Sequence, residues 1–283
     1  MTDVGCLLCR ERACVRLQES EAPYAVYHCS SCDHAFVSPL PNEQMLQLAY
    51  NNEAYYAEWI TTQAARRARL WRSRAARVLG GRPAGQLFDV GCGEGSFLAE
   101  AKTRGWWIAG MEISEAGCRI AEARLGIRLS RGALEAASWP AASFDVVTLW
   151  HVIEHVPDPF GLMQEVARIV RPGGTVVVAC PNRRSYLYNV AYRIGRDRPL
   201  RLFHPSDREL HLSHFSVRSL RFLLAKVGLS VTRVDVDRGH VQRIQAAIDL
   251  VAVALYRCTG LLWSQAMEVW AIKSPQRSAP ASY

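Results

Sequence analysis

The chain has 283 residues, of which 49% are hydrophobic and 21% are charged, and this composition indicates a globular protein with a sizeable core rather than a disordered chain. Its formal net charge of +8 favours an anionic partner, for which nucleic acid, a phosphorylated small molecule and a membrane surface all qualify. Nine cysteines without a signal-peptide pattern predict a cytoplasmic location and disfavour a disulfide framework.

Two Cys-x-x-Cys pairs lie near the N-terminus, Cys6 with Cys9 and Cys29 with Cys32, and 19 residues separate the pairs. This spacing is close to that of a structural zinc ribbon. Four thiolates complete a tetrahedral zinc site and leave no open position for chemistry. The pattern therefore predicts a structural Zn²⁺ site in a zinc-binding module over residues 1–40.

Helical patterns follow over residues 41–50 and 57–79, and a Gly-Gly-Arg-Pro sequence ends the second of them. The second predicted helix is rich in arginine, with Arg66, Arg67, Arg69, Arg72, Arg74 and Arg77. We interpret residues 41–82 as a helical linker or cap between the module and a larger domain.

The larger domain is predicted over residues 83–274, where short apolar runs alternate with helical patterns. This alternation predicts an α/β domain with a mostly parallel sheet covered by helices on both faces. Two insertions interrupt it: a basic, aromatic segment over residues 183–215, predicted to be a lid, and an apolar helix over residues 240–263. The apolar helix suits ordinary core packing best, and a homodimer face, a lid or contact with a membrane surface are the alternatives. Residues 275–283 are predicted to be disordered.

The segment Leu87–Phe97 reads LFDVGCGEGSF, an apolar strand that runs into a glycine turn and then a helix. The alternate glycines from Gly91 to Gly95 let the backbone turn sharply and approach a ligand closely. The pattern differs from a dinucleotide fingerprint because Ser96 stands at its last position. The next predicted strand ends in Glu112, where an acid is placed to accept both hydroxyls of a ribose. Loop and acid together predict a nucleoside-binding site.

The segment His151–His155 reads HVIEH, which matches the His-x-x-Glu-His pattern of one class of zinc metalloproteases. Such a protease needs both histidines on a long helix, whereas this segment follows a strand-like run and Pro157 ends any helix almost at once. We therefore interpret it as a turn beyond a strand tip, where ligands bind in open α/β sheets.

These motifs, in this order and spacing, resemble the class I S-adenosylmethionine-dependent methyltransferases over roughly residues 86–274. The resemblance implies a Rossmann-like seven-stranded sheet with an antiparallel last strand and S-adenosyl-L-methionine as cofactor. It implies that Glu112 binds the ribose and that Ile113 and Leu134 flank the adenine, although Ala133 stands where many members carry an aspartate for the adenine amino group. The implied cofactor contacts are Asp89, Gly91, Cys92, Gly93, Glu112, Ile113, Leu134 and Trp150.

Within this resemblance, residues 151–155 would face the methyl group, and three roles remain open. In the first, Glu154 and His155 only cap and pack the turn. In the second, His155 is oriented by Glu154 and acts as a general base near neutral pH. Alternatively, the segment would hold a divalent metal, as the acid-x-x-Glu-His of the quinone-pathway O-methyltransferases that it resembles can do. Because His151 replaces the first acid and a hard ion prefers oxygen ligands, we favour the general base.

The acceptor is expected to be an anionic small molecule. The predicted lid is rich in arginine and in aromatic residues. Arginine binds phosphate or carboxylate, and aromatic side chains pack against a sugar, a ring or a lipid. The expected acceptor contacts are Tyr56, Arg183 and His211, and His211 and His214 are second-rank candidates for the base. We predict O-methylation of an anionic sugar, a nucleotide-sugar or a lipid-linked glycosyl substrate. The alternatives are a ribosomal RNA methyltransferase with a zinc module, which would show steep salt dependence, and a non-catalytic methyltransferase-like binding protein.

Overall fold

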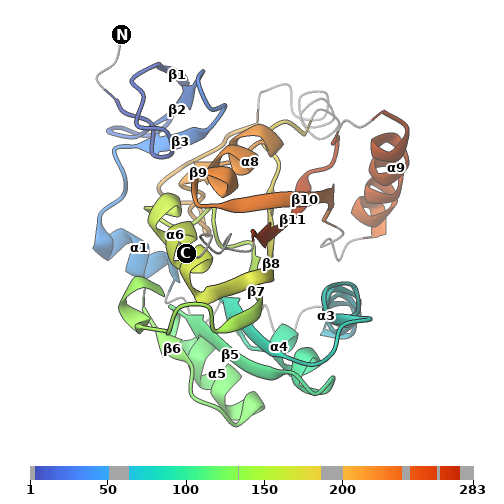
Figure 1. The fold of residues 1–283 in the computed structure, drawn as a ribbon. Coiled ribbons are helices and arrows are strands. Elements are labelled where there is room, and N and C mark those ends of the chain that lie inside the picture. Colours follow the sequence, from blue (N-terminus) through green and yellow to red (C-terminus); the bar gives the residue numbers. More distant parts are fainter. Residues whose placement is uncertain are drawn as a thin grey trace, which may run out of the picture.

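The computed structural model describes residues 4–50, 64–132, 134–185, 200–237, 243–259 and 262–274. Two sheets organise these residues, a seven-stranded sheet and a four-stranded sheet that includes the N-terminal strands (Figure 1). The strands of the larger sheet are β4 (Gln86–Val90), β5 (Trp107–Glu112), β6 (Ser130–Arg131), β7 (Phe144–Trp150), β8 (Val170–Pro181), β10 (Leu229–Val236) and β11 (Ala266–Lys273).

The larger sheet has the order β10-β11-β8-β7-β4-β5-β6. β11 runs antiparallel to both of its neighbours, whereas the pairs from β8 to β6 are parallel. The central strands are buried on both faces, as their almost wholly apolar sequences require. The predicted Rossmann-like, seven-stranded sheet with an antiparallel last strand is confirmed.

Helices cover both faces of this sheet (Figure 1). On one face α3 (Ala64–Leu79), α4 (Ser96–Lys102) and α5 (Glu115–Leu125) share a core with strand residues. On the other face lie α6 (Pro159–Ile169), α8 (Val217–Lys226) and the short 3₁₀ helix η1 (Leu134–Ala137). α1 (Glu43–Tyr50) precedes the larger domain.

The starts of α6 and α8 follow from their sequences. The Asp158 carboxylate accepts hydrogen bonds from the backbone N–H groups of Phe160 and Gly161, and Pro159 occupies the first turn, where its missing N–H costs nothing. The Ser216 hydroxyl and Ser219 form a reciprocal capping box at the start of α8. Both helices therefore begin at fixed points close to the turn after β7 and to the segment 200–215.

The smaller sheet joins the N-terminal module to the predicted lid. β1 (Cys14–Glu19), β2 (Ala25–Cys29) and β3 (Ala35–Ser38) form an antiparallel meander, and the fourth strand is β9 (Ser213–His214). Ala35 pairs with His214 and Phe36 with Ser213, about 180 positions later in the chain. The sequence did not predict this pairing, which places part of the segment 183–215 in the same sheet as the cysteine module.

The apolar segment contains helix α9 (Arg243–Thr259), which contacts β10. Ala252 and Val253 are buried, whereas Leu250 and Val251 are exposed. Among the residues that the structure describes, no helix is both long enough and apolar enough to cross a membrane. Contact with a membrane surface and a homodimer face stay predictions.

Candidate active site

A cavity of about 1030 Å³ lies at the carboxyl ends of β4, β5, β7 and β8. This is the edge at which open α/β sheets bind ligands, and its volume is enough for a nucleoside cofactor together with a second small molecule. The predicted site residues that line it are Asp89, Gly91, Cys92, Gly93, Glu112, Ile113, Leu134, Trp150, His151, Glu154, His155, Arg183, His211 and His214. Tyr56 lies outside the described residues.

The glycine loop after β4 forms one wall of the cavity. Gly91 has φ +65°, and a Cβ atom there would lie 2.5 Å from Cγ2 of Val152, so no other residue fits without a shift. Gly93 has φ +55°, and a Cβ there would meet no atom within 4 Å. The backbone at Gly93 therefore borders open space, as a ligand cradle requires.

Glu112, at the tip of β5, has the geometry of a ribose acceptor. Its carboxylate is only 5% exposed and accepts hydrogen bonds from the backbone N–H groups of Gly93 and Ser114, each at 2.8 Å. Glu112 also lines the cavity, and a carboxylate accepts hydrogen bonds from hydroxyl groups at either oxygen. Ile113, at the rim, is 53% exposed, and Leu134 is buried. The residues present thus fit a nucleoside with its sugar on Glu112 and its base beside apolar side chains.

Asp89 is buried beneath the loop and accepts a hydrogen bond from the Thr148 hydroxyl at 2.6 Å. Burial raises the pKa of Asp89 to about 8, because the neighbouring Thr148 and Arg74 compensate only part of the lost hydration. Trp150, at the end of β7, packs against Phe97 with ring centroids 5.2 Å apart. Both residues reach the cavity from strands that the sequence identified.

A chain of ion pairs lines the cavity, and it is buried at Arg74, Asp237 and Glu154 and partly exposed at His151. The Arg74 guanidinium of α3 donates two hydrogen bonds to the Asp237 carboxylate, at 2.7 and 2.8 Å. The same carboxylate lies 2.9 Å from Nε2 of His151, whose Nδ1 is 3.4 Å from Glu154. Although burial alone lowers it, Asp237 and Glu154 together raise the pKa of His151 to about 9. His151 is therefore an imidazolium near neutral pH with both nitrogens engaged, which does not suit a general base.

His151 also has an unusual backbone, with φ +56°. For a non-glycine residue this left-handed conformation costs free energy and is typical of functional turns. Its N–H donates to the carbonyl oxygen of Ala179 at 2.9 Å, which holds the turn against β8. The strain aims the side chain at Asp237, a residue that sequence analysis missed.

His155 is the better placed base. Its Nδ1 lies 3.0 Å from the carbonyl oxygen of Leu210. Because a carbonyl only accepts, Nδ1 carries the proton in this arrangement, and Nε2 of the neutral ring is then an acceptor. Glu154 was expected to orient this ring, but its carboxylate is 4.0 Å from Nε2 of His155 and nearer to His151. Leu210, in the segment 200–215, provides the orienting hydrogen bond instead.

Two further histidines lie beside this base. The ring centroid of His211 is 4.8 Å from that of His155, and burial lowers the pKa of His211. His214 is 8% exposed, and burial lowers its pKa to about 3, so its ring is neutral at physiological pH. Tyr50, which sequence analysis did not assign to the site, lines the same wall, and its hydroxyl donates to the carbonyl oxygen of His155 at 2.6 Å.

The ligand atoms of Glu154, His155 and His211 all lie within 4.8 Å of one another. Among the described residues, neither carboxylate oxygen of the buried Glu154 accepts a well-formed hydrogen bond, and its nearest cationic contact is the ion pair with Nδ1 of His151 at 3.4 Å. Two imidazoles and one carboxylate suit a transition metal or zinc better than magnesium. The donor set therefore fits the divalent metal that was kept as an alternative, although it differs from the expected one by using His211 in place of His151.

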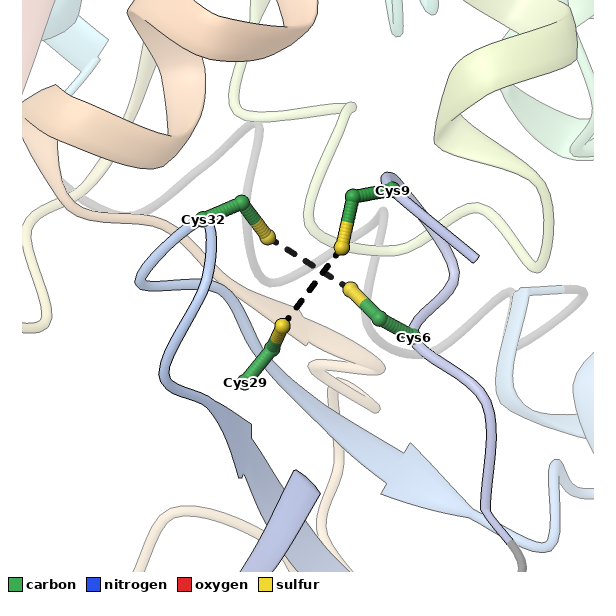
Figure 2. Close-up of side chains that lie close together, drawn as sticks. All are labelled: Cys6, Cys9, Cys29 and Cys32. Atoms are coloured by element: carbon green, nitrogen blue, oxygen red, sulfur yellow. Dashed lines mark hydrogen bonds between the residues drawn. The ribbon is translucent and has the colours of Figure 1, made fainter. Parts of the chain in front are cut away.

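The four N-terminal cysteines meet as predicted from their spacing. The Sγ atoms of Cys6 and Cys32 are 3.5 Å apart, as are those of Cys9 and Cys29, and Figure 2 shows the two pairs crossing. All four sulfur atoms lie within 4.8 Å of one another. Zinc–thiolate bonds of about 2.3 Å in a tetrahedron require sulfur atoms about 3.8 Å apart. This cluster therefore fits one zinc ion, which it would hold with no open position.

Arg67 and Arg74 of α3 also line the cavity, although sequence analysis had not assigned them to the site. They are seven residues apart, so they lie on one face of the helix. This spacing could have indicated that both residues belong to the site, but the same helix carries four further arginines, from which the sequence does not distinguish them. The sequence signal for Asp237 was weaker, because it consists only of an acid that directly follows the end of β10.

Solved structures of methyltransferases share this fold. A S-adenosylmethionine-dependent methyltransferase from Thermotoga maritima superimposes with a TM-score of 0.58 at 22% identity, over 81% of this chain and 100% of that one. Magnesium protoporphyrin IX methyltransferase from Synechocystis, solved with bound S-adenosylhomocysteine, gives a TM-score of 0.57 at 14% identity, over 82% and 100% of the two chains. At these identities the likeness shows the fold alone.

Sequence relatives include the ubiquinone biosynthesis O-methyltransferases of Nitrosomonas europaea and Thiobacillus denitrificans. The first is 34% identical over 133 residues, which are 44% of this chain and 55% of the relative. The second is 36% identical over 124 residues, 41% and 53% of the two chains. The chain spans about half the length of these curated relatives. Residues 62–234 match the family described as a methyltransferase domain, and the chain therefore belongs to that family.

Proposed function

We propose that the protein transfers the methyl group of S-adenosylmethionine to a hydroxyl oxygen of a small anionic acceptor. The observation that carries this proposal is that the glycine cradle and Glu112 share one cavity with His155, whose Nε2 is available to accept a proton. When bound, the cofactor supplies an electrophilic methyl group on a sulfonium, which needs no acid to assist its departure.

The protein's own residues supply alignment and proton removal. The loop from Gly91 to Gly93 and the Glu112 carboxylate fix one reactant, so the acceptor oxygen has to be held in line with the methyl carbon. His155 takes the hydroxyl proton at Nε2, because Leu210 keeps the other nitrogen protonated. Assistance of this kind is typically worth about 10²–10⁴-fold in rate.

Cationic side chains on the acceptor side of the cavity support an anionic acceptor. Arg183, Arg201 and Arg208 line this side, and His151 adds a positive charge below it. Arginine binds carboxylate and phosphate through paired N–H groups. A sugar acid, a nucleotide-sugar and a lipid-linked glycosyl phosphate all fit this chemistry, and the names of the sequence relatives support transfer of the methyl group to an oxygen atom.

A metal-assisted version of this function rests on Glu154, His155 and His211. These three side chains would hold a divalent ion, which when bound would polarise an acceptor hydroxyl. His155 would then be a ligand and would not be free to act as a base. Activity with and without a strong chelator separates the two versions, because only the metal-assisted one requires the ion.

The decisive experiment is a methyl-transfer assay with acceptors of different charge and class. Purified protein with S-adenosylmethionine is offered protocatechuate, glucuronic acid, UDP-glucuronic acid and total RNA, and products are identified by mass spectrometry. We expect an O-methylated product from at least one anionic small acceptor. Product from RNA alone, with steeply salt-dependent binding, would replace this function by RNA methylation. Binding of S-adenosylhomocysteine without turnover on any acceptor would instead favour a non-catalytic role.

A further inference from the structure

Asp33 occupies the turn that follows the last cysteine of the module. It is 2% exposed and has φ +64°, a conformation that aspartate and asparagine tolerate better than other non-glycine residues. Its N–H donates to the carbonyl oxygen of Cys29 at 2.9 Å, so its backbone belongs to the cysteine turn. Its side chain, however, is bonded mainly to residues far away in the sequence.

The Asp33 carboxylate bonds to four side chains. Oδ1 accepts from Nη2 of Arg183 at 2.6 Å and from Nη2 of Arg184 at 2.8 Å, and it lies 3.0 Å from Nε2 of His28. Oδ2 accepts from the Ser216 hydroxyl at 2.6 Å. A buried carboxylate with this many short, charge-assisted hydrogen bonds is a strong and geometrically specific anchor.

Two partners of Asp33 connect it to the acceptor side of the cavity, Arg183 directly and Ser216 through its place in the chain. Arg183 lines the cavity, its side chain is only 14% exposed, and its N–H donates to the carbonyl oxygen of Phe215 at 2.8 Å. Ser216 is the N-cap of α8 and directly follows the segment that carries His211 and His214. Asp33 therefore ties the cysteine module to the two ends of the cavity wall, the exit of β8 and the start of α8.

The pairing of β3 with β9 strengthens this tie. β9 holds His214, and buried Leu210 and Leu212 pack with Val26, Ala35 and other residues of the module in one apolar cluster. Leu210 is also the residue whose carbonyl orients His155. The module thus contacts the acceptor wall through a charged anchor at Asp33 and through an apolar cluster beside it.

We propose that Asp33 is a positioning residue for the acceptor pocket, which it serves by holding Arg183 against the cavity so that the cysteine module sets the affinity for an anionic acceptor. This inference rests on the proposed function. Arg184 is half exposed, so its bond to Asp33 is screened by water and contributes less. Arg183 is the partner through which Asp33 acts, because it is both buried and in the pocket.

The test variant is Asp33→Asn, which removes the charge and keeps a residue that accepts the left-handed backbone. The control is Asp145→Asn, because the Asp145 carboxylate also pairs with an arginine, Arg171, and a backbone N–H but does not line the cavity. Zinc content by elemental analysis and S-adenosylhomocysteine affinity by calorimetry should match the unmutated protein in both variants. Loss of either in Asp33→Asn would make Asp33 a general structural brace and overturn the proposal.

The decisive readout compares an anionic acceptor with its neutral analogue. We expect Asp33→Asn to raise KM for protocatechuate about tenfold or more, as loss of a charged hydrogen bond would, and to leave KM for methyl protocatechuate nearly unchanged. In an Arg183→Gln background the same substitution should add nothing, because Asp33 acts through Arg183. An equal change in KM for both acceptors, or full additivity of the two substitutions, would contradict the proposal.

Hydrogen exchange measures the same coupling without methyl transfer, so it separates this inference from the proposed function. In Asp33→Asn the backbone amides of residues 183–185 and 213–219 should exchange faster, while those of residues 88–95 stay as protected as before. If the unmutated protein methylates neither acceptor but this exchange pattern appears, the acceptor class is wrong and the role of Asp33 stands. Unchanged exchange in both segments overturns the role of Asp33 whatever the activity.

Discussion

The two halves of the cavity are built in different ways. Most of the cofactor half comes from the ends of two neighbouring parallel strands, β4 and β5, between Asp89 and Ile113, and Leu134 and Trp150 complete it. The acceptor half draws on residues that are far apart in the sequence, among them Tyr50, His155, His211 and Asp237. Local sequence patterns therefore describe the first half, whereas the second depends on tertiary contacts. Substitutions that affect one half and spare the other test this division.

The largest effect is expected from His155→Ala. Without a base, kcat on an alcohol acceptor should fall about 10²–10⁴-fold, while affinity for S-adenosylhomocysteine, measured by calorimetry, stays the same. His204→Ala is the control, because His204 bonds to Ser206 and does not line the cavity. Near-normal turnover in His155→Ala would move the base elsewhere, and His211 would be the next candidate because the pKa of His214, lowered to about 3, makes it a poor base.

The next effect concerns stability, through the buried pair between Arg74 and Asp237. Arg74→Met leaves the Asp237 carboxylate, 1% exposed, without its strongest partner, and should lower the free energy of unfolding by about 3–5 kcal/mol in urea titrations. Arg171→Met, which breaks an ion pair whose arginine side chain is 56% exposed, should cost only about 0–1 kcal/mol. Equal losses in both variants would show that the chain of charges below the acceptor half is not a buried anchor.

The fold was largely predictable because the strands of the larger sheet, apart from the two-residue β6, are short, largely apolar runs between helical patterns. The glycine loop and Glu112 were predictable for a related reason, since both are fixed by positions on adjacent strands. The pairing of β3 with β9 was not, because Ser213 and His214 form a strand of two polar residues that only a neighbouring sheet makes ordered. The orientation of His155 by Leu210 also escaped prediction, because backbone carbonyls leave no trace in a sequence pattern.

A smaller effect is expected in the cofactor half from Glu112→Gln. Replacing the carboxylate weakens charged hydrogen bonds to a ribose, so affinity for S-adenosylhomocysteine should fall by about 1–3 kcal/mol. The control is Glu115→Gln, three residues further on, whose side chain is 69% exposed. Calorimetry measures both, and kcat at saturating cofactor should hardly change in either variant. If Glu112→Gln binds as tightly as the unmutated protein, the ribose does not lie on Glu112.

The smallest effect is expected in the pH dependence of stability. It also concerns the acceptor half, because it depends on His151. The carboxylates of Asp237 and Glu154 outweigh burial and raise the pKa of His151 from 6.5 to about 9. A histidine with a raised pKa stabilises the fold fully below pH 6.5, and this stabilisation is lost as the pH rises through about 9. The loss is modest because the His151 side chain is 37% exposed and Arg74 still neutralises Asp237 when the imidazolium deprotonates.

His151→Asn tests this dependence, because asparagine accepts the backbone φ of +56° but carries no charge. Urea midpoints are compared at pH 6.5, 8 and 9.5 for this variant, for the unmutated protein and for His204→Asn. The unmutated protein and His204→Asn should lose stability toward pH 9.5 more steeply than His151→Asn. Only these two proteins contain His151, whose raised pKa lets it carry a stabilising charge that is lost in this pH range. Parallel curves for all three proteins would mean that His151 is neutral at physiological pH, and it would then return as a candidate base beside His155.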